Sequence, residues 1–177
     1  MKRTFNFLIL VIAIFALGTI GCSKEDINEE LPGGCMDVNS PHYNDAAVVD
    51  DESCQFLYVT DYELTNYEDI DWDVLINVDA DVYIKVKKQS SSSWEFSSNV
   101  INDADPSTIQ LWSAPYQFQL LNTTYVWELF DADIPPIDPD DAMSSGTFNP
   151  VTMGSNGVIV SQSIDGLTTV KIHYNLY

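Results

Sequence analysis

The chain has 177 residues, of which 27 are acidic and 7 basic, so its formal net charge is −20 at pH 7. Such a charge argues against nucleic acid as a partner, because the phosphates would be repelled. Hydrophobic residues at 45% and aromatic residues at 12% exclude a disordered chain, and the length suffices for one well-cored domain plus a small appendage.

The N-terminus predicts a lipoprotein signal peptide over residues 1–21. Lys2 and Arg3 precede an apolar run, residues 5–16, which is shorter than the ~20 apolar residues that span a bilayer. The tetrapeptide TIGC that ends at Cys22 resembles the lipobox of bacterial lipoproteins. We therefore expect a lipidated Cys22 at the mature N-terminus, the alternative being a plain secretory signal that is cleaved without lipidation.

Residues 22–34 are polar and acidic and end in Leu-Pro-Gly-Gly. This composition predicts a tether that holds the folded part away from the lipid surface. The tetrapeptide SKED at residues 23–26 resembles the export signal of Bacteroidota surface lipoproteins. That resemblance implies an outer-membrane protein anchored by lipid and facing the cell surface, with the periplasmic face as the alternative.

Residues 35–54 predict a small disulfide-closed unit. The segment resembles the short G-C-x-D…D-D-G-S-C repeat of exported flavobacterial proteins. With Cys22 lipidated, Cys35 and Cys54 are the two thiols left in an oxidising compartment, so we expect them to form a disulfide. A metal role in this unit stays open for Asp37, Asn39, Asp50 and Asp51, although their spacing is not that of an EF-hand.

From residue 55 to residue 177 the pattern predicts an all-β domain, an antiparallel two-sheet sandwich of about eight strands. Val82, Ile84 and Val86 alternate with polar or aromatic neighbours, as in a half-buried strand. We expect hairpin turns at residues 122–124 and at Asp165-Gly166. The expected strands cover residues 56–64, 82–88, 94–101, 116–121, 125–130, 157–163 and 168–176.

Residues 130–146 form the most acidic predicted loop, and a strand precedes them. Crowded carboxylates repel one another unless water or a hard cation lies among them, and the flexible all-oxygen shell of Ca²⁺ suits such a loop. A second acidic patch, at residues 71–81, precedes the strand at 82–88. Two acidic loops at one end of a sandwich could share metal, whereas the alternative is a solvated acidic surface. The loop's aspartates are Asp131, Asp133, Asp138, Asp140 and Asp141.

Two segments carry a resemblance to C2 domains. Residues 81–86, DVYIKV, resemble the family's D-P-Y-V-K-V segment, and residues 131–143 resemble its later D-x-D…D-x-[IM]-G loop. The resemblance covers about the last two-thirds of the chain. It implies a C2-like fold that binds Ca²⁺ and, through it, a lipid headgroup or another anionic ligand. The implied first-loop ligands are Asp73 and Asp81, and the implied third-loop ligands are Asp131, Asp133 and either Asp140 or Asp141.

The chain departs from the C2 pattern at several positions. Val82 replaces the family's proline, two prolines lengthen the third loop, and Ser144 stands where the family usually has glycine. Lys85 and Lys87 share one strand face, which in C2 domains can contact anionic headgroups. The alternative is that solvent-facing lysines discourage edge-to-edge pairing of strands.

Catalysis finds little support in the sequence. The chain has two histidines, His42 and His173, and carries no G-x-S-x-G, H-E-x-x-H or phosphate-binding glycine motif. We therefore expect a non-enzymatic protein. Besides the C2-like module, two further functions stay open: a structural spacer in a surface assembly, and a glycan-binding sandwich whose exposed aromatic rings stack on sugars. The aromatic candidates are Trp72, Trp94, Trp112, Trp127 and Tyr116.

Overall fold

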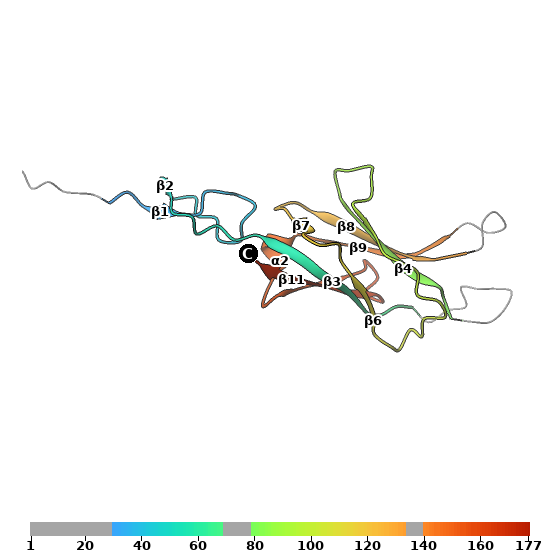
Figure 1. The fold of residues 1–177 in the computed structure, drawn as a ribbon. Coiled ribbons are helices and arrows are strands. Elements are labelled where there is room, and N and C mark those ends of the chain that lie inside the picture. Colours follow the sequence, from blue (N-terminus) through green and yellow to red (C-terminus); the bar gives the residue numbers. More distant parts are fainter. Residues whose placement is uncertain (1–29, 69–78, 134–139) are drawn as a thin grey trace, which may run out of the picture. The chain divides into compact units, whose positions relative to one another are not determined.

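A computed structural model describes residues 30–68, 79–133 and 140–177. Within this described part, a two-stranded sheet and two larger antiparallel sheets form (Figure 1). Residues Leu31–Tyr177 form one compact unit. In the same described part, no helix is long and apolar enough to cross a membrane. The predicted site residues that lie outside the described ranges are Cys22, Trp72, Asp73 and Asp138.

The first large sheet has the strand order β10-β11-β3-β6, and β7 also pairs with β3. Its central strand β3 runs antiparallel to β11 along one edge and to β6 and β7 along the other. The predicted hairpin at Asp165-Gly166 is confirmed, with Gly166 at a φ of 78°, which glycine adopts without strain. The strands are β3 (Leu57–Asn66), β6 (Gln110–Ser113), β7 (Gln119–Leu120), β10 (Val158–Gln162) and β11 (Thr169–Leu176).

The second large sheet has the order β5-β4-β8-β9, with antiparallel neighbours throughout. In β4 the alternating residues Val82, Ile84 and Val86 are fully buried, because they face the other sheet. The predicted loop at 130–146 is shorter than expected, since its last six residues belong to a strand. The strands are β4 (Val82–Lys88), β5 (Phe96–Ser97), β8 (Tyr125–Asp131) and β9 (Asp141–Phe148).

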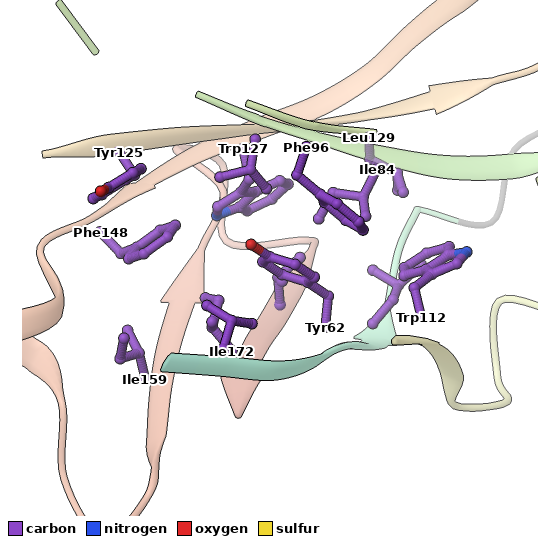
Figure 2. Packing of buried hydrophobic residues seen from close by; sticks show 14 of the residues in the cluster. Tyr62, Ile84, Phe96, Trp112, Tyr125, Trp127, Leu129, Phe148, Ile159 and Ile172 are labelled. Carbon is purple, nitrogen blue, oxygen red and sulfur yellow. The ribbon is translucent and has the colours of Figure 1, made fainter. Parts of the chain in front are cut away.

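The core lies between the two large sheets, whose apolar side chains face each other (Figure 2). A hydrogen-bonded relay joins the sheets at one edge. The Trp127 indole Nε1 donates to the Ser161 hydroxyl at 2.7 Å, and that hydroxyl donates to the Thr147 carbonyl oxygen at 2.9 Å. Gly146 of β9 also bridges to Ser163, which follows β10. The predicted antiparallel two-sheet sandwich is confirmed.

The predicted hairpin at residues 122–124 is wrong. The strand before it, β7, pairs with Leu57 and Tyr58 of β3 in the first sheet, whereas β8 after it belongs to the second sheet. The turn therefore carries the chain from one sheet to the other. Leu120, which pairs with Leu57 of β3, is fully buried. The short helix α2 (Pro150–Met153) was also not predicted.

The predicted disulfide between Cys35 and Cys54 is confirmed, with Cα atoms 4.7 Å apart. Beside it, β1 (Gly33–Gly34) pairs in parallel with β2 (Val49–Asp50). Asp37, Asp50 and Asp51 each accept the backbone N–H two residues ahead, the Asx-turn arrangement. These three carboxylates therefore stabilise turns of the disulfide-closed segment through their hydrogen bonds to the backbone.

The disulfide-closed segment also contacts the sandwich. Asn122, in the turn between β7 and β8, donates from its backbone N–H to the Asn39 side-chain oxygen at 3.2 Å. The Asn122 side-chain amide donates to the Val38 carbonyl oxygen at 2.9 Å. This turn lies at the end of β8 opposite to Asp131, so the segment meets the sandwich at that end.

Replacing Cys35 and Cys54 together with serine is expected to loosen the segment they close and to leave the sandwich folded. A loop of this size gains about 3 kcal/mol from the cross-link in the chain-entropy model, and the sandwich core contains neither cysteine. Limited proteolysis should cut between the two positions in the variant, while the main melting transition stays within roughly 2 °C. Free thiols at both positions in protein purified without reductant would contradict the disulfide.

Candidate functional site

The strand register places several aspartates at one end of the sandwich. Asp131, the last residue of β8, pairs with Val82 at the start of β4 and with Asp141 at the start of β9. Asp81 immediately precedes β4, and Asp133 follows β8 by two residues. The antiparallel pairing therefore gathers these positions on loops that meet at the same end (Figure 1).

Asp131 fastens the loop after β8 to the loop before β4. Its side chain is 1% exposed, and its Oδ1 accepts the Asp81 backbone N–H at 2.7 Å. The neighbouring Ala132 N–H donates to the Asp81 carbonyl oxygen at 2.8 Å. A buried carboxylate is stable only with donors around it. The two acidic loops are therefore joined by direct hydrogen bonds.

Asp81 in turn holds the loop between β5 and β6. Its Oδ1 accepts the backbone N–H of Asp103 at 2.8 Å. Asp103 has a φ of 48°, a left-handed conformation that aspartate tolerates better than most residues. Nearby, the Ala104 N–H donates to the Ala80 carbonyl oxygen at 2.9 Å. The sequence did not single out Asp103, because its contact with Asp81 is made by the backbone.

Asp140 occupies a different part of this end. The Tyr83 hydroxyl donates to Asp140 Oδ2, and the Tyr83 ring stacks on Phe130 with centroids 5.2 Å apart. Burial, followed by the hydrogen bond to the Asp140 carboxylate, raises the pKa of the Tyr83 phenol. Tyr83 and Phe130 face away from the core, whereas Asp131 faces inward with Trp127. The structure thus brings Asp81 and Asp131 together and holds Asp140 against the outer face.

A complete metal shell is not formed by the described residues. Across residues 30–68, 79–133 and 140–177, no three His, Cys, Asp or Glu side chains gather to hold a metal ion. The donor chemistry of the loop end still fits a hard cation, because the donors are carboxylate oxygens. Any shell would therefore also need ligands from outside the described part, where the predicted ligand Asp73 lies.

The two lysines of β4 lie on the outer face of the second sheet, as predicted. The Lys85 ammonium is 4.5 Å from the centroid of the Phe130 ring and 4.9 Å from that of Tyr83. The Lys87 ammonium is 4.1 Å from the Trp94 ring centroid and 3.9 Å from a carboxylate oxygen of Glu128. Cation–π contacts of this kind contribute about 0.5–1 kcal/mol at exposed sites. Both ammonium groups therefore already have partners within the protein.

Two of the five aromatic residues proposed for sugar stacking are in the core. Trp112 is 1% exposed and Trp127 is fully buried, so neither ring can contact a ligand. Trp94 is half-buried against Lys87 and Phe130. Tyr116 is 92% exposed. The sequence could not separate these cases, because large rings are used in cores and on binding surfaces alike.

No family model matches the chain, and no curated protein matches it. Solved structures do match. A C2 domain aligns with a TM-score of 0.46 and 16% identity, over 69% of this chain and 96% of that chain. Human GIVD cytosolic phospholipase A2, in complex with methyl gamma-linolenyl fluorophosphonate, aligns with a TM-score of 0.50 and 14% identity, over 70% of this chain and 17% of that chain.

The sandwich has a C2-like fold. The C2 domains of extended-synaptotagmin 2, calcium bound, also align, with a TM-score of 0.36 and 17% identity over 69% of this chain and 44% of that chain. The C2-like sandwich corresponds to 17% of the phospholipase chain. At these identities the similarity concerns the fold alone, so the function must be argued from the site itself.

Proposed function

We propose that this protein is a lipid-anchored surface protein whose C2-like sandwich binds an anionic ligand through Ca²⁺. Its role is binding rather than catalysis. The anchor is Cys22, and the protein belongs to the outer membrane with the sandwich facing outward. The observation that carries the calcium part is that strand pairing places Asp81, Asp131 and Asp141 at the same end of β4, β8 and β9.

The charge of the chain explains why a cation is needed. A protein with a net charge of −20 repels anions, and aspartates concentrate that repulsion at the loop end. Bound Ca²⁺ supplies the positive charge that an anionic headgroup or another anionic ligand requires. The shell would combine Asp73 with carboxylates from this end of the sandwich, for which Asp81, Asp133 and Asp141 are the candidates. Asp131 contributes by fixing Asp81, whose N–H it binds at 2.7 Å.

Calcium is expected to raise the melting temperature of the calcium-stripped full chain in detergent. Extracellular calcium modules bind with dissociation constants of about 10⁻⁴–10⁻³ M. At a free calcium concentration about a hundred times the dissociation constant, binding stabilises the protein by about 2.7 kcal/mol. This stabilisation raises the melting temperature of a domain of this size by roughly 8 °C. Differential scanning calorimetry with calcium, with magnesium and with neither measures the effect.

Two double variants separate calcium binding from general charge repulsion. Asp133→Asn with Asp141→Asn is expected to remove the calcium response. Asp131 is left unchanged, because its buried carboxylate accepts the Asp81 N–H and its loss would disturb the fold. Asp45→Asn with Glu52→Gln makes the same change of charge at exposed positions of the disulfide-closed segment and should keep the response. The calcium site would be ruled out if calcium did not change the melting temperature of the wild type, or if both double variants responded equally. The acidic loops would then be only a solvated surface.

A further inference from the structure

A pocket of about 500 Å³ lies on the first sheet, away from the acidic loops. Tyr58 at the start of β3 and Asn175 near the end of β11 line it, and these two residues pair across the strands. Tyr58 lies between the buried residues Leu57 and Val59, so its side chain faces outward from the sheet. The loop that joins β6 to β7 also lines the pocket, beside β3 and the end of β11.

Three tyrosine rings surround this pocket, from Tyr58, Tyr116 and Tyr177. The rings of Tyr58 and Tyr177 meet edge to face with centroids 5.7 Å apart. Tyr177 is held by reciprocal backbone hydrogen bonds with Phe56, at 2.7 and 3.1 Å. Tyr116 is 92% exposed. Rigid, exposed tyrosine rings supply contact area at a low cost in conformational entropy.

The loop that carries Tyr116 is built as a tight turn. The Phe118 N–H donates to the Pro115 carbonyl oxygen at 3.2 Å, and Gln117 has a φ of 61°. A left-handed conformation is unfavourable for a residue with an ordinary side chain, and such positions concentrate at functional sites. The turn places Gln117 and Tyr116 in the lining of the pocket and leaves Tyr116 largely exposed.

The lining of the pocket contains no Asp, Glu, Lys, Arg or His, although the chain as a whole has a net charge of −20. Its polar groups are the amides of Gln117 and Asn175, the Thr60 hydroxyl and tyrosine hydroxyls. An anionic ligand would find no cationic side chain there. A ligand with apolar faces and neutral hydroxyls can stack on the rings and hydrogen-bond to the amides.

We propose that this tyrosine-lined pocket is a binding site for a neutral carbohydrate chain. Sugar rings offer C–H faces to the tyrosines and hydroxyls to the amides, and the pocket volume lies within the range of small-molecule sites. The pocket lies at the start of β3, whereas the contacts of Tyr67 with Ala104 and of Ala104 with Ala80 place the acidic loop before β4 beyond the other end of β3. Carbohydrate binding is therefore independent of calcium and adds a second site to the proposed function.

The test is isothermal titration calorimetry of the full chain in detergent, with EDTA present to exclude calcium. The probes are the neutral polysaccharides laminarin, soluble starch, xyloglucan and galactomannan, with hyaluronan as an anionic comparison. At least one neutral polysaccharide should bind, and hyaluronan should not. Tyr116→Ala should weaken that binding on the order of tenfold, because it removes one of the three aromatic rings that line the pocket, and Asn175→Ala should weaken it as well.

Tyr43→Ala is the matched control, because Tyr43 is another exposed tyrosine and lies in the disulfide-closed segment. It should leave the affinity unchanged. Absence of binding to all four neutral polysaccharides overturns the proposal, as does equal binding of hyaluronan or an equal loss in Tyr43→Ala. The proposal is also overturned if a proline-rich peptide binds and none of the polysaccharides does. That result would assign the pocket to a protein partner.

Discussion

Replacing Gly146 with alanine is expected to destabilise the sandwich by about 3 kcal/mol, the upper part of the range for overpacking a core. An added Cβ would lie 2.5 Å from Cζ2 of Trp127 and 2.7 Å from the carbonyl oxygen of Gln162. Neither group can retreat easily. Trp127 is fully buried and hydrogen-bonded to Ser161, and the Gln162 oxygen belongs to the backbone at the end of β10. Urea denaturation followed by tryptophan fluorescence measures the loss.

Gly166→Ala provides the comparison for that experiment. Gly166 has no atom within 4 Å of the added Cβ, but its φ of 78° is unfavourable for alanine. Its replacement should therefore cost about 1–2 kcal/mol from backbone strain alone. If Gly146→Ala costs no more than Gly166→Ala, the close approach between β9, β10 and Trp127 does not exist in solution.

Replacing Cys22 with serine is expected to move nearly all of the protein from the membrane fraction to the soluble fraction. Acyl chains on one cysteine can hold a soluble domain at a bilayer without a spanning helix. Replacing Cys22 therefore removes the proposed anchor. Fractionation of cell envelopes after a carbonate wash, followed by immunoblotting, measures the distribution.

The double variant Cys35→Ser with Cys54→Ser is the control for the anchor. It also removes thiols, but those thiols belong to the disulfide of the folded segment. It should therefore stay in the membrane fraction. If Cys22→Ser continued to pellet with washed membranes, the lipoprotein hypothesis would be wrong.

The strands that the sequence predicted best are those with strict alternation. Residues 82–88 form β4 with unchanged bounds, because three branched apolar side chains on one face leave little choice of register. Strand β9 was missed because Gly146 and Phe148 are its only buried members among eight residues, so the local pattern is weak. It forms by pairing with β8, and the lack of a side chain at Gly146 lets Trp127 pack closely.

The candidate site could be predicted only as far as its location. Clusters of aspartates at the ends of predicted strands place acidic loops, but they do not show where each carboxylate points. Asp131 faces inward to the Asp81 N–H, whereas Asp140 reaches the Tyr83 hydroxyl. A register shift between Leu129 and Phe130 in the pairing of β8 with β9 affects this arrangement, and such bulges have no reliable sequence pattern. The sequence named Tyr116 as a candidate for sugar stacking, but it could not predict the tyrosine-lined pocket, because the pocket's residues come from three distant segments.

The hydrogen-bonded pair Phe56 and Tyr177 marks the end of the sandwich where the chain enters and leaves. The acidic loops are at the far end of β3, which has ten residues and at about 3.3 Å per residue extends about 33 Å. Electrostatic screening in physiological salt has a characteristic length of about 8 Å. Carboxylates separated from the Phe56 and Tyr177 end by about four such lengths do not sense charges located there. In the proposed function, calcium binding at the loops would therefore depend on the medium around them and on the anionic ligand, and not on charges near Phe56 and Tyr177.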